Sequence, residues 1–317
     1  MSYSNRIFMY GPIGLLLLII VLYSVYWRVQ ADTLSARLDR ANGGEVIPGL
    51  VFAFAEKSVG GYPFRLDVVL SGVTFSHPAP EGETAWRTEK LALHTLSYGR
   101  NRYIFEVTGL QSFARPPLVL GTVPRVVFVT PAIARASAIL RDGRLIRFDL
   151  DLLEPQSKDA TQGAAPNRTL TADRAQLHLL ARADNTIDVA MQIDNADIGA
   201  GLSAGGSEIH LPLINLRAKL TQGEALDAFM AGGMSAADAA DAWRMRKGAL
   251  AVSDLALSWP DAHADLKGDL VLNDADRLTG SLEGKGVQGK TPAAFGLTFA
   301  NGDMRFFAKS APPGVAP

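Results

Sequence analysis

The feature that most constrains this chain is an uncharged run near its N-terminus. From Ile7 to Trp27 the sequence reads IFMYGPIGLLLLIIVLYSVYW, with Arg6 and Arg28 at its two ends. At about 1.5 Å rise per residue, a helix of this length is roughly 30 Å long, which is enough to cross the hydrocarbon core of a bilayer. We therefore predict one membrane-spanning helix, and the rest of the chain must fold outside the bilayer.

Five residues of the run are assigned to the membrane anchor. Ile13, Leu16 and Ile20 lie in its apolar middle, and Tyr23 and Trp27 lie near its downstream end. Tyrosine and tryptophan concentrate at the water interfaces of a bilayer, so the last two mark the end of the span.

Two other interpretations of the run stay open, a cleaved signal peptide and a buried core helix. Val29-Gln30-Ala31 loosely fits a cleavage site. The apolar stretch is longer than a secretory core, however, and Arg28 stands where the cleavage region should be neutral. A core helix is disfavoured because the run is apolar on all faces and lies at the terminus.

The charges beside the run favour a cytoplasmic body. Arg28, Arg37 and Arg40 lie downstream, against Arg6 upstream. Lysine and arginine close to a span tend to stay on the cytoplasmic side.

A short helix is predicted to continue over residues 28–42 and to end at Gly43-Gly44. Its partly apolar stripe consists of Val29, Leu34, Leu38 and Ala41. We therefore divide the chain into an anchor with a juxtamembrane helix, residues 1–43, and a β-rich domain, residues 44–317.

Alternation of apolar and polar residues dominates the β-rich domain. Between residues 64 and 70 every even position is apolar and alternates with Arg65, Asp67 and Val69, and the phase then slips at Ser71-Gly72, which predicts a bulge or bend. Polar residues 156–168 predict a long loop and a possible sub-boundary. Hairpin turns are expected at Asp184-Asn185, Asn273-Asp274 and Asn301-Gly302.

These patterns predict a mainly β fold, an extended curved antiparallel sheet shaped as a half-pipe or groove with one apolar face. One helical insertion interrupts it. Thr221 to Glu224 and Ser235 to Asp238 each fit a capping box, and Gly232-Gly233 separates the two short helices that they predict.

Composition excludes several functions. Lys+Arg 31 against Asp+Glu 32 offers no global attraction to nucleic acid, and the absence of cysteine removes thiol chemistry and cysteine-ligated metals. No pair among the five histidines has the i,i+4 spacing of a helical metal site. Asp149 and Asp151 lie on the polar face of a strand, where solvation is the ordinary role of a carboxylate. We expect no catalytic residue, cofactor, metal or nucleic-acid partner.

Residues 284–291, GKGVQGKT, match the pattern of a phosphate-binding loop. Such a loop needs a buried strand before it and a helix after it. Here the preceding strand is half-exposed, and Ala293 to Phe299 reads as another strand. We interpret the match as a connector between strands and expect no nucleotide.

Gly201-Leu-Ser203-Ala-Gly205 matches the G-x-S-x-G pattern of a serine hydrolase. The nucleophile of that pattern stands between a strand and a helix, whereas the residues around His210 read as a strand. A polar loop is the favoured interpretation, and a hydrolase acting through Ser203 is a remote alternative.

Two stretches carry a resemblance to a known family. They are GGYPFRLDVVLSGVTF at 60–75 and GDLVLNDADRLTGSLEGKG at 268–286, with the closing LTFANGDMRF at 297–306. Together with the apolar N-terminus they resemble DUF2125, a bacterial family of uncharacterised membrane-anchored proteins. At the level of the fold, the chain also looks like envelope proteins related to AsmA.

The resemblance implies a single-pass protein of the bacterial inner membrane with most of its chain in the periplasm, against the charge count. It implies a non-enzymatic role in which an apolar groove binds or guides lipid acyl chains and supports envelope lipid homeostasis. A scaffold with a closed β core and no ligand is the alternative, and its protein partners are unknown. The candidate groove residues are Phe64, Leu66, Val68, Leu70, Phe148, Leu150, Val189 and Met191.

Overall fold

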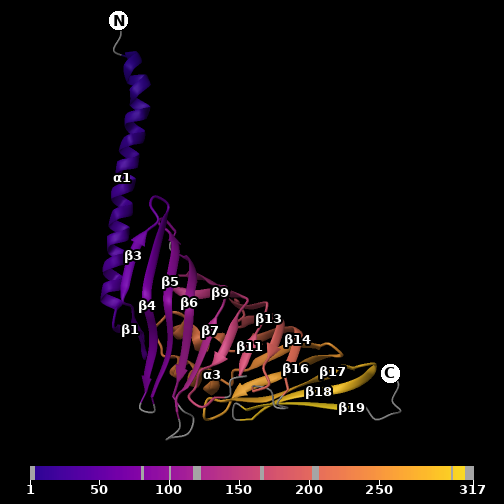
Figure 1. Cartoon of the computed structure of the whole chain (residues 1–317). Coiled ribbons are helices and arrows are strands. Elements are labelled where there is room, and N and C mark those ends of the chain that lie inside the picture. Colours follow the sequence, from indigo (N-terminus) through magenta and orange to yellow (C-terminus); the bar gives the residue numbers. More distant parts are fainter. Residues whose placement is uncertain are drawn as a thin grey trace.

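A computed structural model describes residues 4–79, 82–99, 101–116, 123–164, 168–201, 207–300 and 303–310. Within them, the strands form one 19-stranded sheet in which the paired strands are antiparallel. Figure 1 shows a long helix that extends away from one end of this sheet, which twists progressively toward the C-terminus. The predicted fold class, a mainly β chain with an extended antiparallel sheet and a short helical insertion, is confirmed.

The N-terminal half consists of the long helix and the first ten strands. Their bounds are α1 (Ser4–Ala41), β1 (Gly44–Ile47), β2 (Leu50–Ala53), β3 (Glu56–Gly60), β4 (Arg65–Ala79), β5 (Gly82–Leu96), β6 (Arg102–Arg115), β7 (Arg125–Thr130), β8 (Ile133–Arg141), β9 (Arg144–Leu153) and β10 (Gln156–Asp159).

The C-terminal half holds the remaining strands and the helical insertion. Their bounds are β11 (Thr169–Thr171), β12 (Arg174–Ala181), β13 (Ile187–Ile198), β14 (Ile209–Leu220), η1 (Gly223–Leu226), α2 (Asp227–Met230), α3 (Ala236–Met245), β15 (Leu250–Trp259), β16 (Ala262–Leu272), β17 (Leu278–Gln288), β18 (Thr291–Ala300) and β19 (Asp303–Ser310).

Helix α1 is continuous from the apolar run into the juxtamembrane segment and ends at Ala41, just before the predicted Gly43-Gly44 stop. Leu34, Leu38 and Ala41 pack against buried residues of the first strands, as the stripe predicts. Val29 does not take part, because its side chain is exposed.

The slip of phase in β4 is also confirmed. Leu66, Val68 and Leu70 are buried, and after the break the buried position moves to Val73. Gly72 makes the change possible because its φ of +62° lies in the left-handed region that glycine adopts without strain.

The segment 156–168 does not form one long loop. Gln156 to Asp159 make strand β10, which pairs with β7 on one side and β11 on the other. Polar residues are tolerated there because the strand is short and partly exposed. β9 pairs directly with β12, so the sheet continues past this segment.

One of the two predicted capping boxes is correct. Ser235 Oγ accepts a hydrogen bond from the Asp238 backbone N–H and caps α3. Thr221 does not cap a helix. Its hydroxyl instead accepts from the N–H of Ala249, which ties the end of β14 to the start of β15.

The GKGVQGKT segment is a hairpin, as interpreted from the sequence. Its first five residues end β17, Thr291 begins β18, and Gln288 pairs with Thr291 across the turn. Its glycines serve strand packing. A Cβ on Gly284 would lie 1.7 Å from the Asp265 carbonyl oxygen, and a Cβ on Gly286 would lie 1.9 Å from that of His263.

We expect Gly284→Ala and Gly286→Ala each to lower the free energy of unfolding by about 1–3 kcal/mol, because the new methyl group must push the neighbouring strand away. Chemical denaturation of the full chain in detergent measures the change. Gly60→Ala is the matched control, since nothing lies within 4 Å of its Cβ position. Lys290→Ala should be neutral because Lys290 is exposed. Equal stability of all four variants would contradict this account of the glycines.

Candidate functional site

Apolar side chains are aligned across the sheet, strand after strand, on one face. Directly opposed residues of antiparallel strands point to the same side, so the pairing register decides which side chains stack. One row crosses ten strands and consists of Val68, Leu93, Phe105, Ala136, Leu150, Leu177, Met191, Leu216, Leu255 and Leu266.

A second row lies beside the first on the same face, and each of its members is two residues along the strand from a member of the first row. Its members are Leu70, Leu91, Val107, Ala134, Leu152, Ala175, Ile193, Ile214, Leu257 and Ala264. The two rows make a continuous apolar face from β4 to β16. Such a face must be covered by protein, by another molecule or by lipid.

The described chain covers this face at its two ends. At the N-terminal end, Phe52, Phe54, Val68, Leu70, Val73 and Leu91 form a buried cluster beneath α1. At the other end, strands β14 to β18 enclose a second cluster, which contains Leu255, Leu266, Leu282, Phe295 and Leu297.

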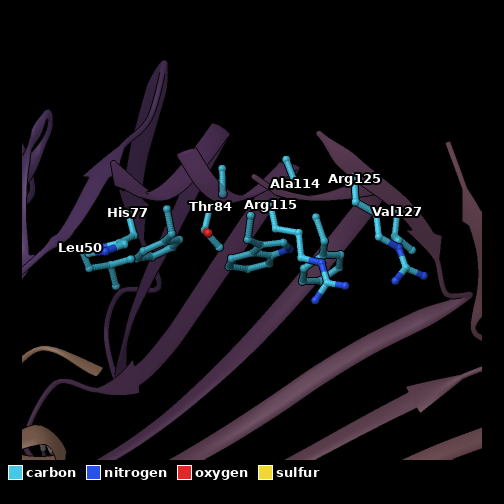
Figure 2. A pocket seen from close by; sticks show the side chains of 11 residues that line it. Leu50, His77, Thr84, Ala114, Arg115, Arg125 and Val127 are labelled. Atoms are coloured by element: carbon cyan, nitrogen blue, oxygen red, sulfur yellow. The ribbon is translucent and has the colours of Figure 1, made fainter. Parts of the chain in front are cut away.

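Between the two clusters, the face is hollowed over β5 to β9. One cavity there has a volume of about 490 Å³, and its lining includes Phe105, Val107, Phe148 and Leu150. A second cavity, of about 510 Å³, lies toward the far ends of β4 to β7 (Figure 2). Each falls within the usual volume range of ligand pockets.

The two cavities share the side chains of Phe75, Trp86 and Phe113, so together they form one depression, which we name the apolar trough. These three rings stack along it, with centroids 5.6 Å apart between Phe75 and Trp86 and 6.4 Å apart between Trp86 and Phe113. The trough is therefore an aromatic-walled channel along the sheet.

The structure distributes the eight predicted groove residues among five surroundings. Phe148 and Leu150 line the apolar trough. Leu66, Val68 and Leu70 are buried in the clusters under α1, and Leu66 is only 1% exposed. The other three lie elsewhere: Val189 packs against the C-terminal cluster, Met191 is half-buried between Leu177 and Leu216, and Phe64 is 64% exposed.

Side chains near the end of the apolar run form hydrogen bonds with the sheet and its loops. Tyr23 Oη donates a 2.7 Å hydrogen bond to the carbonyl of Pro63 and lies 2.8 Å from Ser97 Oγ. Trp27 Nε1 donates to the carbonyl of Arg65 at 2.7 Å. The three middle anchor residues, Ile13, Leu16 and Ile20, contact no core cluster and are exposed.

Large apolar side chains gather where the helix meets the sheet. Phe64 lies beside the ring of Tyr23, with centroids 6.5 Å apart, and Tyr62 packs edge-on against Trp27. Tyr98, on the neighbouring loop, is 67% exposed. We name Tyr62, Phe64, Leu96 and Tyr98 the helix-side rim.

The opposite face of the sheet is polar and carries ion pairs. Arg174 holds the pKa of Asp151 below its ordinary value. Burial raises the pKa of Asp149, but hydrogen bonds from Arg147, His178 and Ser137 outweigh it and leave that pKa lowered. Neither carboxylate is a poised general acid, which needs a raised pKa.

Three of the histidines pair with a carboxylate on the next strand of this face. The pairs are His94 with Asp67, His178 with Asp149, and His210 with Asp197, at 2.6–2.7 Å. Within the described residues, no three His, Asp or Glu side chains are grouped as a metal site requires. Ser203 lies outside the described residues.

A cluster of charges lies at the far end of the trough. Arg115 and Arg125 are directly opposed on β6 and β7 and both line the cavity of Figure 2, where their guanidinium groups extend to the same side. Asp159 is only 5% exposed and faces Arg125 and Arg168. Hydrogen bonds from Thr161, together with the two arginines, hold the pKa of Asp159 below its ordinary value.

Sequence reasoning missed this cluster because its members are separated by long stretches of chain. Arg115 and Arg125 become neighbours only through the β6–β7 register. The one available signal was Arg115, which follows Phe113 in the same phase of the strand, and that signal does not show which residue lies opposite.

The helical insertion links distant parts of the sheet. Asp227 of α2 forms an ion pair with Arg144 at the start of β9, at 2.6 Å. The loop between α2 and α3 reaches the β1–β2 turn, where Gly49 and Ser235 lie side by side. Arg244 of α3 binds Asp274 and Asp276 in the turn between β16 and β17.

These features define a class of protein: one long antiparallel sheet with an apolar trough, joined to an apolar helix. That helix, over Tyr10–Ala41, is long and apolar enough to cross a membrane. The chain belongs to the family of uncharacterised proteins conserved in bacteria known as DUF2125, whose model matches residues 27–285.

The family match leaves out most of the apolar run and the last strands, so it is narrower than the resemblance noted in the sequence. No curated protein and no solved structure matches the chain. The likeness to AsmA-related proteins gains no support from these comparisons.

The depressed pKa of Asp159 predicts a loss of stability in acid. An unfolded aspartate titrates near 3.9, so the contribution of the ionised carboxylate is complete above about pH 4 and is lost as the pH falls through the lower folded value. Between pH 5 and pH 2, the native protein should therefore lose more stability than Asp159→Asn.

Denaturation of the full chain in detergent across this pH range measures the effect. Asp265→Asn is the control, because Asp265 is exposed and has no ion pair among the described residues. If Asp159→Asn follows the pH profile of the native chain, the buried ion cluster contributes nothing to folding.

Proposed function

We propose that this protein is a non-enzymatic, membrane-anchored lipid-binding protein whose apolar trough holds or guides acyl chains. The observation that carries the proposal is the pair of aligned apolar rows, which the chain buries at both ends and leaves half-buried over β5 to β9. An aliphatic chain fits such a surface, because it needs burial along its length and offers no polar group to satisfy.

The position of the sheet relative to the apolar helix supports the bilayer as the source of the lipid. Tyr23 lies four residues before the end of the uncharged run, about 6 Å inside it at 1.5 Å per residue. Its contacts with Pro63 and Ser97 therefore bring the helix-side rim to the level of the bilayer interface. Exposed aromatic side chains are favourable at that level.

The packing of α1 also supports an anchor that is retained rather than cleaved. Trp27 is 8% exposed and forms a buried cluster with Ala31 and Leu66. Cleavage after Ala31 would remove two of these three side chains from the cluster. We propose that the helix spans the bacterial inner membrane once and that the sheet lies in the periplasm, where it supports envelope lipid homeostasis.

The second candidate is an envelope scaffold without a ligand. The buried C-terminal cluster favours it, because that part of the sheet closes over its own apolar side chains. The open trough over β5 to β9 favours lipid. A hydrolase acting through Ser203 remains the remote alternative, and unchanged growth of a Ser203→Ala strain in place of the native strain would dismiss it.

Photocrosslinking in cells tests the lipid proposal. We expect benzoylphenylalanine at Phe105 or Leu150 to give covalent lipid adducts, because both side chains line the trough. The matched controls are Glu106 and Asp151, the next residues on the same strands, which point to the polar face. Mass spectrometry of the purified full chain counts the adducts.

Lipid adducts at the two trough positions and not at the two controls would support the proposal. Equal adduct yields at all four positions, or none at any of them, would refute lipid binding in the trough and favour the scaffold.

Orientation is tested separately, and the absence of cysteine makes the test simple. We expect Asp151→Cys to react in intact cells with a maleimide that crosses the outer membrane but not the inner one, since Asp151 is half-exposed on the polar face. Ser4→Cys, at the other end of α1, should react only after lysis. The reverse pattern would place the sheet in the cytoplasm, as the charge count favours.

A further inference from the structure

The end of the trough that lies away from the helix is positively charged. Arg115 and Arg125 face each other across β6 and β7, and like charges in this position destabilise a sheet. Asp159 offsets part of the charge, but it is shared between Arg125 and Arg168. Arg115 has no ion pair among the described residues. The cluster therefore keeps an excess of positive charge beside an apolar cavity.

Unsatisfied hydrogen-bond donors accompany this charge. Arg125 Nε is buried without a hydrogen bond, and its distance of 3.6 Å from Asp159 is too long for one. Trp86 Nε1 and Gln111 Nε2 are also buried and unpartnered, and both side chains line the trough. Buried donors without partners are uncommon in native proteins, and a bound ligand is one physical reason for them.

The order of these groups along the strand is informative. From the end of β6 inward come Arg115, then Phe113 with the opposed Trp86, then Gln111, and then Val107 and Phe105. At about 3.3 Å per residue, the Trp86 level lies roughly 7 Å from the arginines. A phospholipid presents the same order: an anionic phosphate, then ester oxygens that accept hydrogen bonds, then an acyl chain.

We propose that Arg115 and Arg125 form the headgroup site for an anionic phospholipid in the trough. The phosphate lies between the two guanidinium groups, the ester oxygens accept from Trp86 Nε1, and an acyl chain extends past Phe105 toward Leu150. This inference rests on the proposed function. It adds the direction in which the lipid lies in the trough and the chemistry of its headgroup.

The site lies far from the bilayer. His77, which lines the same cavity, is twelve residues along β4 from Arg65, the residue whose carbonyl binds Trp27. Twelve residues of extended strand span about 40 Å. The bound molecule is therefore a lipid that has left the membrane, with its headgroup at the membrane-distal end of the trough.

A competition experiment with the full chain tests the headgroup site. Protein carrying benzoylphenylalanine at Phe105, in lauryl maltoside, is irradiated with equal amounts of phosphatidylglycerol and phosphatidylcholine of different acyl mass. Both lipids carry a phosphate that can accept hydrogen bonds from the arginines, but the quaternary ammonium of phosphatidylcholine cancels its net charge and is repelled by the same two side chains. We therefore expect about tenfold more phosphatidylglycerol adduct. Arg115→Gln should reduce the ratio to about threefold, and Arg115→Gln with Arg125→Gln to about one.

Arg87→Gln is the matched control, because Arg87 lies on the opposite face of β5 and pairs with Glu83. Thermal melts verify that the variants are folded, and Arg115 is exposed, so its single variant keeps the fold. A ratio of phosphatidylglycerol to phosphatidylcholine adduct that falls as the arginines are replaced supports the inference. A ratio that the arginine variants leave unchanged overturns the headgroup site but not lipid binding. Absence of any adduct overturns both.

Discussion

The register between neighbouring strands is the constraint on which this structure depends. Alternation along each strand makes one face apolar, but only register brings Val68, Leu150 and Leu266 into one row across the sheet. A shift by a single residue on any strand would turn its apolar side chains to the polar face. Because the row crosses ten strands, its apolar side chains must be covered along the whole sheet, which no single hairpin can do.

The chain solves this problem in two ways. At its N-terminal end α1 covers the face, and toward the C-terminus the sheet curls tightly enough for its own side chains to form a core. That tight curl explains the glycines of β17, where no Cβ fits against the carbonyl groups of β16. Over β5 to β9 the apolar face is covered neither by α1 nor by a curl of the sheet, and this part of the face is the apolar trough.

The contacts of Tyr23 and Trp27 couple the apolar helix to the sheet and, under the proposed function, relate the trough to the bilayer. These two residues were assigned to the interface from sequence, but their polar atoms also bind Pro63, Ser97 and the first residue of β4, Arg65. The anchor is therefore part of the folded domain, and Ala31 and Leu34 continue its packing. The trough has two arginines at the end away from the helix and apolar side chains along the rest of its length, so it has a direction, which suits a lipid with one polar end.

The sequence by itself determined several elements: the apolar helix, its end near Gly43, the bend at Gly72, the hairpin turns at Asp184-Asn185 and Asn273-Asp274, and the hairpin nature of GKGVQGKT. The predicted turn at Asn301-Gly302 lies outside the described residues. Sequence reasoning succeeded because alternation, turn residues and helix stops are local. It failed at Thr221 and at 156–159, where a tertiary hydrogen bond and pairing with β7 outweigh local preference.

Only the tertiary structure decided which apolar residues are core and which line a trough. Leu66 and Leu150 occupy equivalent places in their alternating strands, yet one is buried under α1 and the other faces a cavity. Likewise, Arg115 and Arg125 are ten positions apart in sequence and directly opposed in space. Whether a side chain is buried, and which residue lies opposite it, depends on the neighbouring strand and on what covers the sheet. The alternating pattern of one strand does not identify that neighbouring strand.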